Sequence, residues 1–133
     1  MGEDWPSVVR AEIESDVRRV AERLRTLSDA QLTAEAAPYS TRAAGGRAVA
    51  QKLAETAQAI EERHSGAEPQ WRAVPELTAF AVGDQLAVMG HDLVVALDSV
   101  SPDEPVWAHG TRRTAREVVA DSAAQLAALR GVL

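Results

Sequence analysis

Cysteine is absent from this chain of 133 residues. Its absence excludes disulfide bonds, thiolate metal sites and a cysteine nucleophile, and it leaves the redox compartment open. Aromatic residues are also scarce, at 4%. Alanine, valine and leucine must therefore fill the core, and such small side chains suit close helix packing. Lysine occurs once, as Lys52, among basic residues that are otherwise arginine, a preference that we attribute to codon bias.

The chain also lacks the features of several functional classes. No run approaches the ~20 apolar residues of a membrane span, and residues 1–4 lack the basic start and apolar stretch of a secretory signal. The net charge of −6 gives an acidic surface that repels phosphate backbones. We therefore expect a cytoplasmic protein with neither a membrane nor a nucleic acid as partner.

What is present is the composition of a globular protein, with 46% apolar and 26% charged residues. Its length fits one domain over residues 1–133, which buries roughly two-thirds of the surface of the unfolded chain. Apolar residues recur at helical spacing in four segments. These stripes predict helices over about 5–27, 41–64, 82–99 and 115–130.

Local signals mark where these helices begin. Asp4 is the expected N-cap of the first helix, with Pro6 in its first turn. Capping boxes at Ser28–Gln31 and Thr114–Glu117 open a short helical turn and the last helix. In the second long helix, the pair Gly45–Gly46 either lets the first turn fray or allows close approach of another segment.

The connections complete the predicted fold, an all-α four-helix bundle. Residues 65–81 contain glycine and proline but are too apolar for a solvated linker, so we expect them to cross one end of the bundle and cover it. A short extended piece or small hairpin is expected near residues 105–113. The third long helix is apolar on most sides, which places it at the centre of the bundle or at a subunit interface.

Three segments resemble one protein family. The stretch Val88–Leu97, which contains Gly-His-Asp-Leu, resembles a bundle-helix signature of the mycothiol-dependent maleylpyruvate isomerases, members of the DinB-like superfamily of helical bundles. Residues 27–32 are similar to the turn after the first helix in that family, and residues 49–54 to its second-helix segment. Together these segments cover under a third of the chain, and their order agrees with the predicted helices.

The resemblance implies a divalent metal held by a histidine of the second helix and a Glu-x-x-x-His pair of the third. In this chain Lys52, Gln85 and Met89 occupy the corresponding positions. An ammonium cannot ligate a metal while protonated, and a thioether is a poor ligand for borderline divalent ions. The sequence therefore predicts a member of this group that has neither the metal site nor another cofactor.

His91 and Asp92 are two polar residues inside an otherwise apolar helix. One interpretation places one of them in solvent and the other against a buried donor of a neighbouring helix. The other interpretation groups Lys52, Gln85, Met89, His91 and Asp92 around the pocket left by the metal, where Lys52 and Asp92 pair or bind a polar ligand. We assign structural roles to the remaining histidines, His64 at a helix end and His109 in an exposed turn.

A small basic cluster, Arg112, Arg113 and Arg116, precedes or begins the last helix. It suits either an anion at the helix N-terminus or surface ion pairs, and the acidic surroundings favour the pairs.

The leading functional hypothesis is a metal-free module that binds a small molecule or a partner. The alternatives are a thiol-dependent transferase or isomerase with a redesigned site, in which His91 is the acid or base, and a homodimer that uses the apolar third helix.

Overall fold

The computed structural model describes residues 4–133 and is mostly helical. Four long helices form the bundle: α1 (Ser7–Thr26), α3 (Arg42–Glu61), α4 (Val82–Leu97) and α5 (Ala115–Arg130). A short helix, α2 (Asp29–Thr33), follows α1, and a 3-10 turn, η1 (Ala79–Ala81), precedes α4. The two strands β1 (Pro105–Ala108) and β2 (Thr111–Thr114) form one small sheet. The structure confirms the predictions of a mostly helical bundle and of a small hairpin near residues 105–113.

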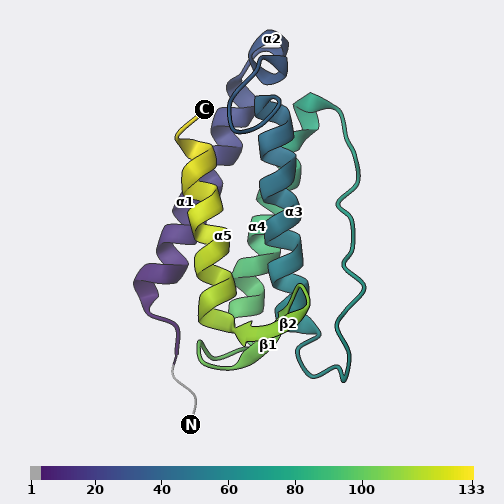
Figure 1. Ribbon diagram of the computed structural model, residues 1–133. Helices are drawn as coiled ribbons and strands as arrows, with labels where there is room; N and C mark the ends of the chain where they lie inside the picture. The colour runs from purple at the N-terminus through teal and green to yellow at the C-terminus, as the bar shows by residue number, and fades with distance from the viewer. Residues whose placement is uncertain (1–3) are drawn as a thin grey trace.

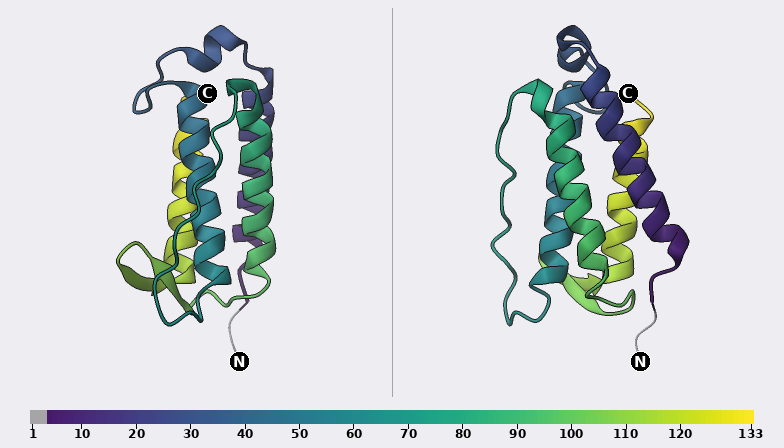
Figure 2. Two further views of the ribbon diagram at one scale, coloured as in Figure 1. Left: turned by 90° about the vertical axis from the view of Figure 1, so that its right-hand side faces the viewer. Right: turned by 180° about the vertical axis from the view of Figure 1, so that it is seen from behind.

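The helix directions explain the longest connection. In Figure 1, α1 and α5 run from the end that carries the hairpin toward the opposite end, whereas α3 and α4 both run toward the hairpin. Because consecutive helices α3 and α4 are parallel, the chain between them must return along the whole length of the bundle. Residues 62–78, which we call the strap, make this return beside α3 (Figure 2). The expectation that this segment crosses one end of the bundle was therefore wrong.

The end opposite the hairpin is covered instead by residues 27–40 (Figure 1). Ser28 caps α2, where its side chain accepts a hydrogen bond from the backbone of Gln31, and the Gln31 side chain completes the capping box. Leu27 and Leu32, at 4% and 0% exposure, anchor this cover in the core. The capping box was predicted correctly, and it places the chain reversal at the end of α1.

Side chains cap the starts of α3 and α5 but not those of α1 and α4. Thr41 caps α3 and Thr114 caps α5, the latter through a complete capping box with Glu117. The N-cap position of α1 is Pro6, and no side chain caps it. The prediction that Asp4 fills this role was wrong, because the helix begins at Ser7 and leaves Asp4 outside its first turn.

The core lies between the four long helices, which contact one another in the cyclic order α1, α4, α3, α5. The expected apolar stripes face it; on α3, for example, Val49, Leu53 and Ile60 are at most 1% exposed. Gly45 and Gly46 permit close contact rather than fraying. A Cβ at Gly45 would lie 2.7 Å from the Tyr39 ring, and both glycines are buried inside the helix.

The hairpin sits at the end of α3 and at the start of α5. Its strands pair antiparallel from Pro105–Thr114 to Ala108–Thr111, and Gly110 at the turn has a φ of 75°, which glycine adopts without strain. Glu104 fixes its base: Oε1 lies 2.9 Å from Nε of Arg63, just beyond the end of α3, and Oε2 accepts a hydrogen bond from the Ser101 backbone. The Arg63 guanidinium and the Ser101 N–H hold the pKa of the Glu104 carboxyl below its usual range.

One segment within residues 4–133, Ala79–Leu97, is long and apolar enough to cross a membrane by composition alone, and half of it is buried in the bundle. A core helix of a soluble protein has the same properties. The helix is therefore consistent with a soluble bundle, in which α4 contributes much of the core.

Candidate functional site

A cavity of about 210 Å³ lies between α3, the strap, the hairpin and the start of α5, and we call it the hairpin cavity. Its polar and aromatic lining comes from α3, the strap and the hairpin, and α5 adds the apolar Val118: Lys52, Glu55, Thr56, Trp71, Trp107, His109, Thr111 and Arg113. At ~30 Å³ for each molecule of liquid water, the space equals roughly seven waters. It therefore suits a small organic molecule.

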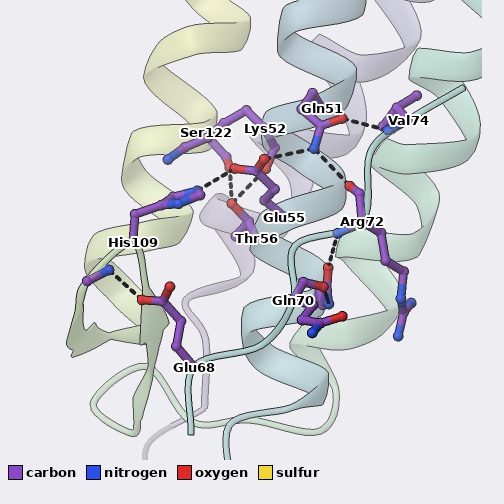
Figure 3. Close-up of polar contacts among 12 residues, drawn as sticks. Gln51, Lys52, Glu55, Thr56, Glu68, Gln70, Arg72, Val74, His109 and Ser122 are labelled. Atoms are coloured by element: carbon purple, nitrogen blue, oxygen red, sulfur yellow. Dashed lines mark hydrogen bonds and ion pairs between the residues drawn. The ribbon is translucent and has the colours of Figure 1, made fainter. Parts of the chain in front are cut away.

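Glu55 and His109 form the best-defined polar pair of the cavity. His109 Nε2 lies 2.8 Å from Glu55 Oε1, and the other carboxylate oxygen accepts a hydrogen bond from Gln51 Nε2 at 2.7 Å (Figure 3). A carboxylate is an acceptor, so the imidazole donates from Nε2, which leaves Nδ1 as the acceptor of a neutral ring. Nδ1 has no hydrogen-bond partner among residues 4–133. The pair thus orients a basic nitrogen.

Two further groups of the lining carry unused hydrogen-bonding capacity. The His109 ring packs on Trp71, with ring centroids 4.7 Å apart. The Trp71 indole nitrogen is buried without a hydrogen-bond partner. Lys52 forms no ion pair with any carboxylate in the described chain. The ammonium at this cavity favours a ligand that carries negative charge.

The strap is attached to α3 by side-chain amides. Gln51 donates to the Arg72 carbonyl and accepts from the Val74 N–H (Figure 3). Gln58 likewise donates to the Gln70 carbonyl and accepts from the Arg72 N–H. Each amide thus binds the extended backbone at two points, as a neighbouring strand would. Further along the strap, Glu68 accepts a hydrogen bond from the Gly110 N–H at the hairpin turn. These contacts fix the positions of Trp71 and His109 relative to α3.

The other polar side chains around the cavity form hydrogen bonds or ion pairs within the chain. Thr56 and Ser122 bring their hydroxyl oxygens to 2.7 Å in the contact between α3 and α5. Arg113 pairs with Asp121 and Glu117, and the Asp121 carboxylate raises the pKa of Arg113 above its usual value. Arg113 is therefore neutralised by its own chain, and Lys52 is the cation left for a ligand in this lining.

The five residues singled out from the sequence do not form one site. Met89 and Asp92 line a second cavity of about 230 Å³ between α3, the strap and α4, and Gln85 donates to the Pro75 carbonyl there. His91 is exposed in a groove between α1 and α4. Lys52 faces α5 and the hairpin, so the expected ion pair between Lys52 and Asp92 does not form.

The residues at the expected metal positions do not fit a metal. Gln85 offers one neutral oxygen, buried and without a partner, while its nitrogen is bound to the strap. Met89 adds only a thioether, and Lys52 belongs to another cavity. Within residues 4–133 no cluster of three histidine, cysteine or acidic side chains exists. A borderline divalent ion needs imidazole, thiolate or carboxylate ligands, and this arrangement supplies none.

Sequence analysis singled out Lys52 but missed the other residues that define the hairpin cavity, above all Glu55, Trp71 and His109. His109 was assigned to an exposed turn, and its side chain is indeed 62% exposed, but it is also bound to Glu55 and packed on Trp71. One feature of the sequence could have indicated a polar site here. Gln51 and Glu55 are four residues apart, so they lie on one helix face. Nothing local indicated which helix the hairpin would contact.

The basic cluster agrees with its ion-pair interpretation. Arg113 and Arg116 bind acidic side chains, the latter Asp103 at 2.9 Å. Arg112 lies 4.0 Å above the Trp107 ring and donates to the backbone carbonyls of Arg63 and Ser65 at the start of the strap. No family of known proteins, no curated protein and no solved structure matches the chain.

Proposed function

We propose that this chain is a metal-free helical bundle of the DinB-like type that binds a small carboxylate in the hairpin cavity, in the cytoplasm. The observation that carries the proposal is that Lys52, which lacks an acidic partner in the described chain, lines the same cavity as the His109 ring held by Glu55. Stoichiometric zinc, nickel or iron at one site of the purified protein would contradict the metal-free part.

The arrangement of the helices supports the DinB-like part of the proposal. The three segments that carry the resemblance follow one another along the bundle: residues 27–32 after α1, residues 49–54 on α3 and residues 88–97 on α4. The side chains at the former ligand positions have other partners or surroundings, most clearly Gln85 with the strap. In this proposal the bundle keeps the helix pattern of the group, and its polar site lies at the hairpin.

The ligand class follows from charge and shape. The Lys52 ammonium pairs with an anion, and Trp71 and Trp107 add aromatic surface to the same lining. Glu55, already bound to Gln51 and His109, adds a negative charge to the α3 side of the cavity. We therefore expect a small monocarboxylate with a compact apolar part rather than a phosphate or a dianion.

Binding is expected to depend on Lys52. Titration calorimetry with a series of small monocarboxylates should find saturable binding by at least one of them, and its primary amide should not bind. Lys52→Met should weaken that binding about 10–100-fold, since a hydrogen bond to a charged group contributes roughly 1.5–3 kcal/mol. Arg18→Met is the matched control, because Arg18 is an exposed cation of α1 in a different groove. Equal affinities of Lys52→Met and wild type would refute the proposal.

One observation favours an enzyme as the second candidate function. Glu55 orients His109 so that Nδ1 is free to take a proton from a bound molecule, which is the geometry of an assisted general base. From the sequence, His91 was the candidate acid or base. His91 lies outside the cavity, so His109 is the candidate base instead. A screen with low-molecular-weight thiols and electrophiles, comparing wild type with His109→Gln and His91→Ala, tests it. Turnover that survives His109→Gln would exclude this base.

A further inference from the structure

The middle of the strap, residues 66–77, is attached to the bundle through side chains, and we call this segment the flap. Every hydrogen bond or ion pair that joins it to the rest of residues 4–133 has a side chain on at least one side. The helices, in contrast, are held by continuous backbone hydrogen bonds. Segments without such bonds are the parts of a protein that open first.

Both ends of the flap are anchored. The Ser65 carbonyl, just before it, accepts hydrogen bonds from the Trp107 indole and from Arg112 on the hairpin. The Thr78 carbonyl, just after it, accepts a hydrogen bond from the Ala81 N–H of η1 at 3.0 Å. The flap therefore has two fixed ends, and its movement requires no change in a long helix.

Two glutamines of α3, seven residues apart on one helix face, hold the centre of the flap. Gln51 and Gln58 each donate one N–H to a glutamate four residues further along the helix, at 2.7 and 2.6 Å. The other N–H and the oxygen of each amide bind the backbone of the flap. Because a carboxylate of the same helix holds each amide, the amide keeps the orientation that binds the flap.

The centre of the flap is a wall of both cavities beside α3. Trp71 lines the hairpin cavity, and residues 72–75 line the second cavity, between α3 and α4. The His109 ring packs on Trp71. Gln51 joins the flap to Glu55, which binds His109 (Figure 3). Movement of the flap therefore removes a wall of the hairpin cavity and the ring on which His109 packs.

We propose that residues 66–77 open as one unit while the helices stay folded, and that the flap closes over a small carboxylate in the hairpin cavity. A molecule that contacts Trp71 loses that contact in the open form. It therefore binds the closed form more tightly and shifts the chain toward it. The closing rests on the ligand site proposed above, whereas the opening as one unit does not.

Hydrogen exchange of the Arg72 and Val74 amides, followed by NMR on the whole chain, tests the opening. These N–H groups bind Gln58 and Gln51, so each exchanges only when the flap leaves α3. Without denaturant, their protection factors should agree within about threefold and lie at least about 100-fold below that of Leu53, in the middle of α3. Protection equal to that of Leu53 would overturn the proposal, because the flap would then open only when the whole chain unfolds.

Gln58→Met tests whether the flap opens as one unit. It removes the two hydrogen bonds between this side chain and the flap, and it leaves the acceptor of Val74 in place. Relative to Leu53, protection should fall about tenfold at both Arg72 and Val74, since two neutral hydrogen bonds contribute a factor of about ten or more. Gln125→Met, at an exposed site on α5, is the matched control and should change neither. A fall at Arg72 alone would show that these residues open separately and would overturn the proposal.

The closing is tested with acetate, butyrate and benzoate, each at about 100 times the dissociation constant that calorimetry gives for it. Any of the three that binds should slow the exchange of Arg72 and Val74 at least about tenfold. Binding without slower exchange would overturn the closing while the ligand site stands. Absence of binding by all three would refute the closing together with the ligand site, whereas the opening is decided by Gln58→Met without any ligand.

Discussion

Replacing Gly46 with alanine is expected to lower the free energy of unfolding by about 1–3 kcal/mol, the usual effect of overpacking a core. A Cβ at this position would lie 2.4 Å from Val82 Cγ1 and 3.1 Å from Leu24 Cδ1. Both neighbours are buried, at 0% and 2% exposure, and a β-branched valine has little rotamer freedom to move aside. The crowding therefore outweighs the ~1 kcal/mol by which alanine is intrinsically the better helix residue.

Urea unfolding measures this effect, and two further variants identify its cause. Gly66→Ala is the matched control, because a Cβ there meets nothing within 4 Å. It should change stability by at most about 0.5 kcal/mol, as is usual for surface sites. Adding Val82→Ala to Gly46→Ala should cost less than Val82→Ala costs alone, because the new methyl group occupies part of the vacated space. Wild-type stability of Gly46→Ala would contradict the close approach of α3, α4 and α1.

Thr56→Val is expected to destabilise the chain by about 1–3 kcal/mol, although the two side chains have nearly the same shape. The reason is the Ser122 hydroxyl, which is 0% exposed and faces Thr56 Oγ1 at 2.7 Å. Valine would leave this buried hydroxyl without its partner. Ser122→Ala should cost less, because Thr56 keeps its hydrogen bond to the Lys52 carbonyl on the preceding turn.

The double variant separates the hydrogen bond from packing. Thr56→Val combined with Ser122→Ala should be more stable than Thr56→Val alone, since an apolar pair leaves no unsatisfied hydroxyl in the contact. Chemical denaturation of the four proteins gives the coupling free energy directly. Strictly additive effects would show that the two hydroxyls do not interact. The contact matters for the site because Thr56 lines the hairpin cavity next to Lys52.

The helices could be predicted because their signals are local. Apolar stripes at a spacing of three and four residues located α1, α3, α4 and α5, and capping boxes at Ser28 and Thr114 located two helix starts. These features depend on backbone hydrogen bonds within one segment. The path of the strap could not be predicted in this way. It follows from the parallel directions of α3 and α4, which are a property of the whole bundle.

The candidate site was harder to predict because it depends on helix rotation and on distant segments. Lys52 was expected beside Gln85, but a helix turns about 100° per residue, so neighbouring side chains face different elements. In the structure Gln51 binds the strap next to Pro75, the residue whose carbonyl binds Gln85, whereas Lys52 faces α5 (Figure 3). Glu55, Trp71 and His109 come from a helix, the strap and the hairpin. No spacing along the chain relates them.

The Trp71 indole N–H signal in a proton–nitrogen NMR spectrum tests the proposed ligand site most directly. Trp71 lies in the cavity wall with a buried, unpartnered N–H, whereas Trp5 and Trp107 already donate to the carbonyls of Val100 and Ser65. A bound carboxylate should shift the Trp71 signal strongly and in saturable fashion and should leave the Trp5 signal unchanged. In Lys52→Met the same carboxylate should not shift the Trp71 signal. A carboxylate that binds tightly while the Trp71 signal stays in place would show that the ligand site lies elsewhere on the bundle.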